Sequence, residues 1–272
     1  MKPFYLDGPS GRLFCLWLGP DKPMCSIIYC PPFAEEMNRC RRMASITAMA
    51  MADNGIGVLI PDLYGTGDSE GDFGDSSWEK WIDDIDACTH WIQSNKKSAE
   101  VSLWGIRVGA LLATEVCRRN QQISSLLFWQ PVTSGSTAIT QFLRIKLAAS
   151  FRKIERETPN TLRKKLEAEK KVEVGGYNLN PELIIPIDKL KMENLFPEKK
   201  VSVKWFDVSS FDEDLIPPSV KNVIEIWEKT GCQITYKKIH GTTFWATQEM
   251  TVCNELKNKT IEAVIQGAII DG

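Results

Sequence analysis

Short apolar runs alternate with helix-like segments along most of this chain, and this alternation limits the folds open to it. The apolar runs are short enough to be buried strands, and they lie at 26–30, 56–60, 101–104 and 125–129. Amphipathic patterns between them predict helices over 38–53, 77–94 and 108–120. Strands separated by helices pair in a parallel sheet that helices cover on both faces. The sequence therefore predicts an α/β fold.

Both sides of this series depart from the simple alternation. Residues 3–6 and 13–18 are apolar runs separated by turn residues, and they predict an antiparallel hairpin. Over 131–200 the rhythm stops, and a basic helical segment over 142–171 runs into Gly175-Gly176 and a Pro-punctuated stretch. We interpret 131–200 as an inserted cap. Strands over 201–208 and 232–239 then resume, with helices over 219–229 and 255–266.

This order of elements resembles that of the α/β-hydrolase fold. The expected core, residues 1–130 and 201–272, is an eight-stranded, mostly parallel sheet, and a helical cap or lid is inserted after the sixth strand. In open sheets of this kind, ligands bind at the carboxyl ends of the strands. The loops that follow the strands are therefore where a site is expected.

Composition excludes several classes of function. Lys and Arg number 33 against 35 Asp and Glu, so no overall field attracts nucleic acid or an anionic membrane. The eight cysteines form no CxxC pair, and no motif indicates a metal or a cofactor. The most apolar stretch, 43–52, is too short to span a bilayer, and the first residues lack the apolar run of a secretory leader. We expect a protein of the cytoplasm that is not transmembrane.

The strand over 101–104 leads into Gly105-Ile106-Arg107-Val108-Gly109, which we call the elbow. Its two glycines have the spacing of the G-x-S-x-G nucleophile elbow, where the turn is so tight that its flanks must be small. Arg107 stands at the nucleophile position, and arginine has no nucleophilic atom to activate. Acyl-enzyme chemistry therefore cannot start from this residue.

Two interpretations of the elbow remain open. Gly105 and Gly109 can simply let strand and helix pack closely. Alternatively, Arg107 points into the cleft and pairs with an internal carboxylate or binds an anionic ligand. Two adjacent acids, Glu35 and Glu36, follow the strand over 26–30 and are candidate partners, although acids in a first helical turn also complement the helix dipole.

The same loop is where an oxyanion hole is expected. By position, its donors would be the backbone amides of Phe33 and Val108. The loop over 61–69, with its pattern D-x-x-G-x-G-x-S, is predicted to shape the backbone, because it lacks the lysine of a phosphate-binding loop.

An acid and a base can be sought in the remaining strand-end loops. Asp214 is the best match to the acid position after the seventh strand. The usual position of the base histidine holds Thr243. His240 lies three residues earlier and is a candidate displaced base, whereas His90 falls within a helical pattern and is interpreted as a surface or packing residue.

Three segments carry a more specific resemblance, and they are PPFAEEMNRCRRM, PDLYGTGDSEGDFGDSSW and LWGIRVGALLA. In this order and spacing they resemble the exosortase-associated hydrolases of the second type, and the likeness covers nearly the whole chain. The resemblance implies a serine-hydrolase-like α/β fold in bacteria that have exopolysaccharide and exosortase sorting systems. It also implies that Arg at the nucleophile position is a trait of the family. Components of those systems are then candidate partners.

Two main hypotheses of function follow. In the first, the chain is a degenerate hydrolase that binds a small anionic or acyl-bearing ligand, or a partner, beneath the cap through Arg107. In the second, it hydrolyses an ester or thioester of polysaccharide or acyl-carrier origin, with His240 activating water or another nucleophile such as Cys30 or Ser69. A purely structural role in a sorting or export assembly is a third interpretation.

Overall fold

The structure, a computed structural model, describes residues 1–96, 100–149, 157–169, 172–210, 215–247, 249 and 251–271. Within these residues eight strands form one sheet, in the order β1-β2-β4-β3-β5-β6-β9-β10. The strands are β1 (Lys2–Asp7), β2 (Arg12–Leu18), β3 (Ser26–Cys30), β4 (Gly57–Pro61), β5 (Val101–Ile106), β6 (Ile123–Trp129), β9 (Ser202–Ser209) and β10 (Gln233–His240). The predicted fold, an eight-stranded and mostly parallel sheet, is confirmed.

Strand direction follows the predicted pattern. β1 and β2 form an antiparallel hairpin, and β2 also pairs antiparallel with β4. The pairs from β4 through β3, β5, β6 and β9 to β10 are all parallel. The carboxyl ends of β3, β5, β6 and β9 therefore lie at one edge of the sheet, and the loops that leave them share that edge.

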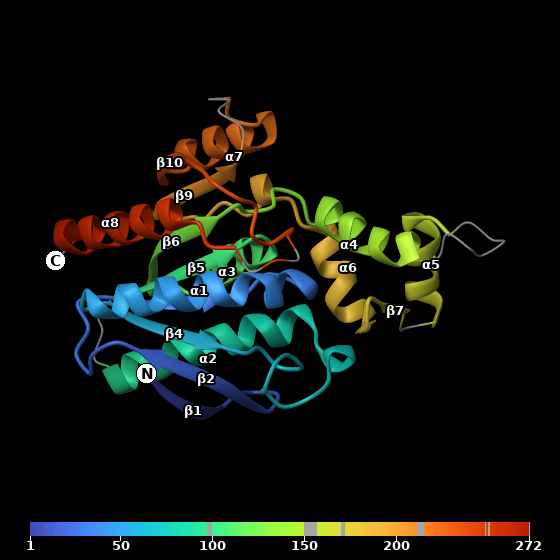
Figure 1. Cartoon of the computed structure of the whole chain (residues 1–272), viewed down its shortest axis with the longest axis horizontal. Coiled ribbons are helices and arrows are strands. Elements are labelled where there is room, and N and C mark those ends of the chain that lie inside the picture. The colour runs from blue at the N-terminus through green and yellow to red at the C-terminus, as the bar shows by residue number, and fades with distance from the viewer. Residues whose placement is uncertain are drawn as a thin grey trace.

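Helices cover both faces of the sheet (Figure 1). Helices α1 (Glu35–Asp53) and α8 (Asn254–Asp271) pack on one face, where an apolar cluster includes Met43, Trp104 and Leu256. On the other face are α2 (Trp78–Lys96), α3 (Val108–Arg119) and α7 (Pro218–Lys229). In the described part of the chain, no helix has the length and apolarity needed to cross a bilayer.

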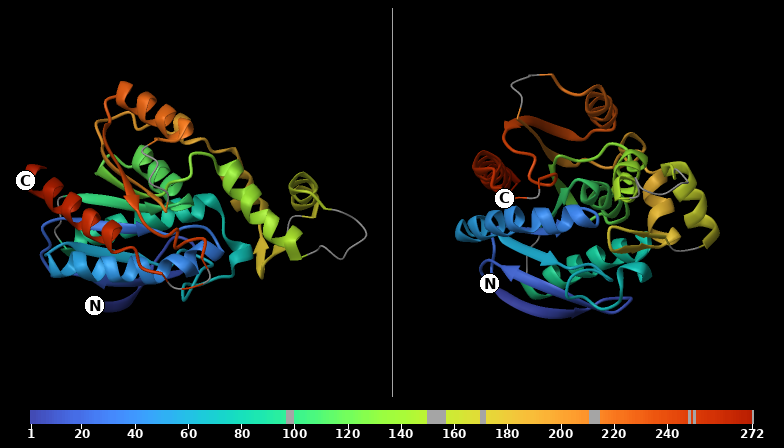
Figure 2. Two further views of the ribbon diagram at one scale, coloured as in Figure 1. Left: turned by 45° about the horizontal axis from the view of Figure 1, so that its top comes forward. Right: turned by 45° about the vertical axis from the view of Figure 1, so that its right-hand side comes forward.

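The segment between β6 and β9 forms the helical cap. Its elements are α4 (Gly135–Ala149), α5 (Pro159–Glu169), the hairpin β7 (Val172–Val174) and β8 (Tyr177–Leu179), α6 (Pro181–Lys189) and the 3-10 helix η2 (Met192–Asn194). Figure 2 shows from two directions that these elements stay together beside one end of the sheet. The cap contacts the core through Asn180, whose side-chain amide donates to the carbonyl of Gly74 at 3.0 Å.

The single basic helical segment predicted over 142–171 is wrong. Helix α4 begins earlier, at Gly135, and a separate helix, α5, begins at Pro159. Proline favours the first position of a helix, and the hydroxyl of Thr158 accepts the N–H of Thr161 at 3.1 Å, as a capping residue does. These two residues define a helix start within the predicted segment.

A hairpin that the sequence analysis did not predict lies around Gly175-Gly176, ahead of the Pro-punctuated stretch. Strands β7 and β8 pair antiparallel, with Val174 opposite Tyr177. The two residues between them, Gly175 and Gly176, have φ of 58° and 85°. Two successive positive φ values are what a two-residue hairpin turn needs, so this glycine pair was the available signal.

Candidate active site

The elbow has the strained backbone of a nucleophile turn. β5 ends at Ile106 and α3 begins at Val108, and Arg107 between them has φ 56° and ψ −117°. Backbone hydrogen bonds hold this conformation, because the N–H of Arg107 donates to the carbonyl of Trp129 at 3.1 Å and its own carbonyl accepts from Val132 at 3.3 Å. A side chain at positive φ costs free energy, and such strain persists where the surrounding structure enforces it.

The two glycines of the elbow leave no room for a side chain. A β-carbon on Gly109 would lie 2.1 Å from the carbonyl oxygen of Cys30, and one on Gly105 would lie 2.5 Å from the α-carbon of Ala110. Both glycines therefore do let the strand and the helix pack closely, as the first interpretation predicts. It does not compete with a role for Arg107, because the same close packing presents the Arg107 side chain above the edge of the sheet.

Arg107 is nearly buried, with 12% of its side chain exposed, and it contacts residues from three parts of the chain. Its Nε lies 3.2 Å and 3.3 Å from the two carboxylate oxygens of Glu36. Its Nη2 lies 3.5 Å from Oε1 of Gln141 in the cap, and its guanidinium carbon lies 5.5 Å from the ring centre of Trp245. Within the described residues, Nη1 makes no hydrogen bond. One strong donor therefore remains available.

The two acids of the first turn of α1 have different partners. Glu36 pairs with Arg107, whereas Glu35 pairs with Arg39 at 3.6 Å, one turn along the same helix. Burial raises the pKa of the Glu36 carboxyl above its usual value, and the positive charges of Arg107 and Arg39 oppose this rise. Of these two candidate partners of Arg107, which the sequence alone could not separate, Glu36 is the one that pairs with it.

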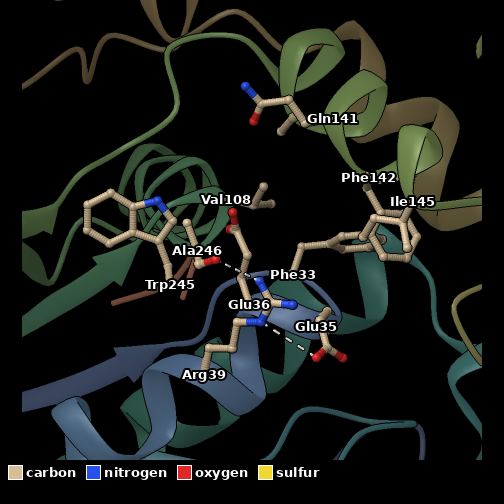
Figure 3. Close-up of a pocket in the computed structure, with 11 residues that line it drawn as sticks. Phe33, Glu35, Glu36, Arg39, Val108, Gln141, Phe142, Ile145, Trp245 and Ala246 are labelled. Atoms are coloured by element: carbon tan, nitrogen blue, oxygen red, sulfur yellow. Dashed lines mark hydrogen bonds and ion pairs between the residues drawn. The ribbon is translucent and has the colours of Figure 1, made fainter. Parts of the chain in front are cut away.

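A pocket of about 170 Å³ lies between the elbow and the cap (Figure 3). Its walls are mainly apolar, with Trp245 on one side and Phe142 and Ile145 on the other. The full lining is Phe33, Glu35, Glu36, Arg39, Val108, Ala138, Gln141, Phe142, Ile145, Trp245 and Ala246. Arg107 is not itself among these residues, but three of them, Glu36, Gln141 and Trp245, contact its side chain, so the guanidinium lies against the lining of the pocket.

Both predicted oxyanion donors lie at this pocket. Phe33 and Val108 line it, and within the described residues the backbone N–H groups of both make no hydrogen bond to the protein. The next residue, Ala34, has φ 50° and ψ −121°, almost the same backbone conformation as Arg107. Free amides beside a pocket can donate to the oxygen of a bound carbonyl or carboxylate.

In the part of the chain that the structure describes, no histidine base lies at the pocket. Asp214 lies outside the described residues. Thr243 is half-buried in the loop after β10, and a threonine there cannot act as a histidine base. His240 ends β10 with its side chain exposed, and it is not among the residues that line the pocket. His90 is exposed on α2, with Nδ1 2.9 Å from the carbonyl of Asp86.

The two alternative nucleophiles have other surroundings. Cys30 is fully buried at the end of β3, and burial raises the pKa of its thiol, which keeps it protonated. The Ser69 hydroxyl donates to the carbonyl of Asp62 and accepts the N–H of Phe14 at 2.8 Å. These two hydrogen bonds connect the loop after β4 to β2. Within the described chain, no cluster of His, Cys, Asp and Glu is arranged to hold a metal ion.

Several residues of the site were not found from the sequence. Trp245, Gln141 and Arg39 come from three distant segments, and only folding brings them together. Asp207, a buried acid outside the pocket lining, was also missed, because it lies within the apolar run of β9. It is 5% exposed and accepts hydrogen bonds from Trp205 Nε1 at 2.9 Å and from the Tyr236 hydroxyl at 3.1 Å, and burial raises the pKa of its carboxyl.

The sheet order, the inserted cap and the strained elbow define an α/β-hydrolase fold. The chain belongs to the serine aminopeptidase S33 family, whose sequence pattern matches residues 22–207. This family assignment covers the elbow and the whole segment between β6 and β9. A comparison with curated protein sequences gave no match.

Several solved structures share the fold. Est1E from Butyrivibrio proteoclasticus, with ferulic acid bound, is 16% identical, with a TM-score of 0.65 over 98% of this chain and 99% of that one. DcsB, in complex with its substrate analogue, is 13% identical, with a TM-score of 0.65 over 100% and 99%. An alpha-beta serine hydrolase homologue from Coxiella burnetii is 13% identical, with a TM-score of 0.57 over 96% of both chains.

Proposed function

We propose that this chain is a degenerate hydrolase that binds a small acyl- or carboxyl-bearing molecule beneath the cap and forms no acyl-enzyme at the elbow. The observation that carries the proposal is Arg107 itself. It occupies the nucleophile position in the backbone conformation of that turn, yet its side chain offers hydrogen-bond donors and no nucleophile.

The available donors at and beside the pocket suit one kind of ligand atom. Arg107 Nη1 and the amides of Phe33 and Val108 are without protein partners in the described chain, and all can donate to an oxygen. A carbonyl or carboxylate oxygen accepts such bonds, and a bond from a charged donor is about twice as strong as one between neutral groups. The ferulic acid bound to Est1E is itself a carboxylic acid, which fits this class of ligand.

The sequence resemblance to the exosortase-associated hydrolases suggests where such a ligand would arise. We propose that it comes from the acyl groups of an exopolysaccharide or of a sorted protein, handled by the chain in the cytoplasm. Components of the same systems would then be its partners. The motif wording of the three segments quoted above carries this part of the proposal.

The test combines hydrolysis with binding, and 4-nitrophenyl hexanoate serves as the probe. We expect the parent protein to release no nitrophenolate above the rate in buffer, and to bind the intact ester in equilibrium dialysis. The double variant Arg107→Gln/Glu36→Gln removes both charges together, so no buried charge is left without its partner. We expect it to fold and to bind the ester at least about tenfold more weakly.

A matched control replaces the ion pair between Arg119 and Glu79, which joins α3 to α2 away from the pocket. The variant Arg119→Gln/Glu79→Gln should bind the probe as the parent does. Equal affinity in the Arg107→Gln/Glu36→Gln protein would overturn the proposal. Release of nitrophenolate that disappears in His240→Ala would replace it with the second hypothesis, an active esterase with a displaced base.

A further inference from the structure

Among the described residues, the charged side chains that line the pocket are already paired. Glu36 pairs with Arg107 and Glu35 with Arg39, so the two negative charges are each met by a positive one. A carboxylate ligand would bring a third negative charge into a pocket with apolar walls, and that charge would lose its hydration without a new cation to meet it. An uncharged carbonyl needs only hydrogen bonds, and the donors for these are in place.

The walls of the pocket set the size of the rest of the ligand. Phe33 and Phe142 meet edge to face, with ring centres 5.0 Å apart, and close one side of a space of about 170 Å³. An apolar cavity of roughly this size holds one benzene molecule. The acyl part of a ligand that fills the pocket therefore has about six carbon atoms.

One helix of the cap supplies the wall that decides how long the acyl part can be. Ala138, Gln141, Phe142 and Ile145 line the pocket, and their spacing of three, four and seven residues places them on one face of α4. Ala138 has the smallest side chain of the four and stands one turn before Gln141. Ile145 stands one turn after it and is 41% exposed, on the side of the pocket away from Trp245 (Figure 3).

We infer that the pocket takes an uncharged ester or amide with an acyl chain of about six carbon atoms, and that Ala138 and Ile145 determine the chain length. This inference rests on the proposed function, because it assigns the acyl carbonyl to the donors of the elbow. It goes further, because it excludes the free acid as the preferred ligand and names the residues that limit the length of the acyl chain.

The test uses calorimetric titration of the parent protein with four probes, and these are N-methylacetamide, N-methylhexanamide, N-methyldecanamide and hexanoate. Amides are chosen because they are not hydrolysed during the titration. We expect N-methylhexanamide to bind at least about tenfold more tightly than hexanoate, which has the same chain and an added charge. The acetyl amide should bind more weakly, since it leaves the apolar walls in contact with water.

Two variants then change the size of the pocket in opposite directions. Ala138→Leu adds three carbon atoms to the wall, so the affinity for N-methylhexanamide should fall at least about tenfold, while that for N-methylacetamide changes by less than about twofold. Ile145→Ala opens the wall, so the affinity for N-methyldecanamide should rise about fivefold or more. Ala138→Ser, which keeps the size of the side chain, is the control and should leave the order of the probes unchanged.

The outcomes separate this inference from the proposed function. If hexanoate binds as tightly as N-methylhexanamide, or if Ala138→Leu leaves the preference among chain lengths unchanged, the inference is overturned and the proposed function stands. If none of the probes binds to the parent protein, both are overturned. The expected order of the amides, shifted by both variants in opposite directions, supports both.

Discussion

The turns after β3 and β5 differ from the loop after β4 in which residues take the strained backbone. Ala34 and Arg107 carry side chains at φ 50° and 56°, each directly before a helix. In the loop after β4, the positive φ values fall on Gly65, Gly67 and Gly71. Glycine adopts such angles at little cost, whereas a residue with a β-carbon pays for them.

The difference follows from what each segment contributes. The two strained turns present backbone amides to the pocket and hold the Arg107 side chain against its lining, and a glycine at position 107 would remove the contacts to Glu36 and Trp245. The loop after β4 adds no side chain to the pocket lining. Its path is fixed instead by carboxylates, since Asp62 accepts the N–H of Asp68 at 3.0 Å and Asp84 accepts that of Tyr64 at 2.8 Å. Strain on a residue with a side chain is thus found at both turns of the site, and it also occurs at Gln130 (φ 42°), which follows β6 and does not line the pocket.

The largest expected effect concerns the contact between the two strained turns. Gly109→Ala would place a β-carbon 2.1 Å from the carbonyl oxygen of Cys30 and 2.5 Å from that of Pro31, and neither backbone atom can rotate away. We expect the free energy of unfolding to fall by about 4 kcal/mol or more, measured by urea denaturation.

The matched control is Gly267→Ala in α8, where an added β-carbon has no atom within 4 Å. That change should stabilise the protein by up to about 1 kcal/mol, because alanine is the better helix former. A Gly109→Ala protein as stable as its parent would mean that the two turns can move apart, and the comparison would lose its structural basis.

The second effect tests the carboxylate that fixes the loop after β4. Asp84 is fully buried, and its Oδ1 has no hydrogen-bond partner. Burial raises the pKa of its carboxyl from 3.8 to about 7. The folded protein therefore holds this proton more tightly than the unfolded chain does, and the free energy of unfolding should fall as pH rises from about 4 to about 8, by about 2–4 kcal/mol.

Replacing Asp84 should remove this dependence. Between about pH 5 and about pH 8, the free energy of unfolding of the parent should show most of the fall described above. Asp84→Asn should show little of it, because the residue that titrates is gone. Asp53→Asn, at an exposed position at the end of α1, serves as the control and should follow the parent. Denaturant titrations at several pH values provide the measurement, and identical profiles for the parent and Asp84→Asn would contradict the assignment.

The smallest effect measures the strain directly. Ala34→Gly loses one buried methyl group but relieves a positive φ, whereas Ala48→Gly, in the middle of α1, loses a buried methyl group and places glycine inside a helix. We expect Ala34→Gly to destabilise the protein by at least about 1 kcal/mol less than Ala48→Gly. Equal losses in urea denaturation would show that the backbone at Ala34 is not strained.

The fold and the elbow could be predicted because local patterns determine them. Apolar runs mark the strands, and the spacing of Gly105 and Gly109 marks the turn between β5 and α3. The cap was predicted less well. The glycine pair at the turn of β7 and β8 and the proline at the start of α5 were visible, but both lie in a strongly charged segment where apolar periodicity is weak.

The contacts of the site could not be predicted for a different reason. Nothing local distinguishes Glu36 from Glu35, since both are acids in the first turn of α1, and one helical position decides which carboxylate reaches Arg107. Gln141 and Trp245 reach the same guanidinium from segments on either side of β9. Asp214, the predicted acid, lies outside the described residues, so its role stays a prediction.

The backbone bonds of the elbow separate the shape of this turn from the identity of its central side chain. The carbonyl of Arg107 and its N–H are both held by main-chain partners, and the neighbouring glycines are fixed by packing. Serine and arginine codons can differ by a single nucleotide, as AGC and AGA do. A gene encoding such a turn can therefore exchange a nucleophile for a cation, or the reverse, in one mutational step without having to rebuild the main chain around it.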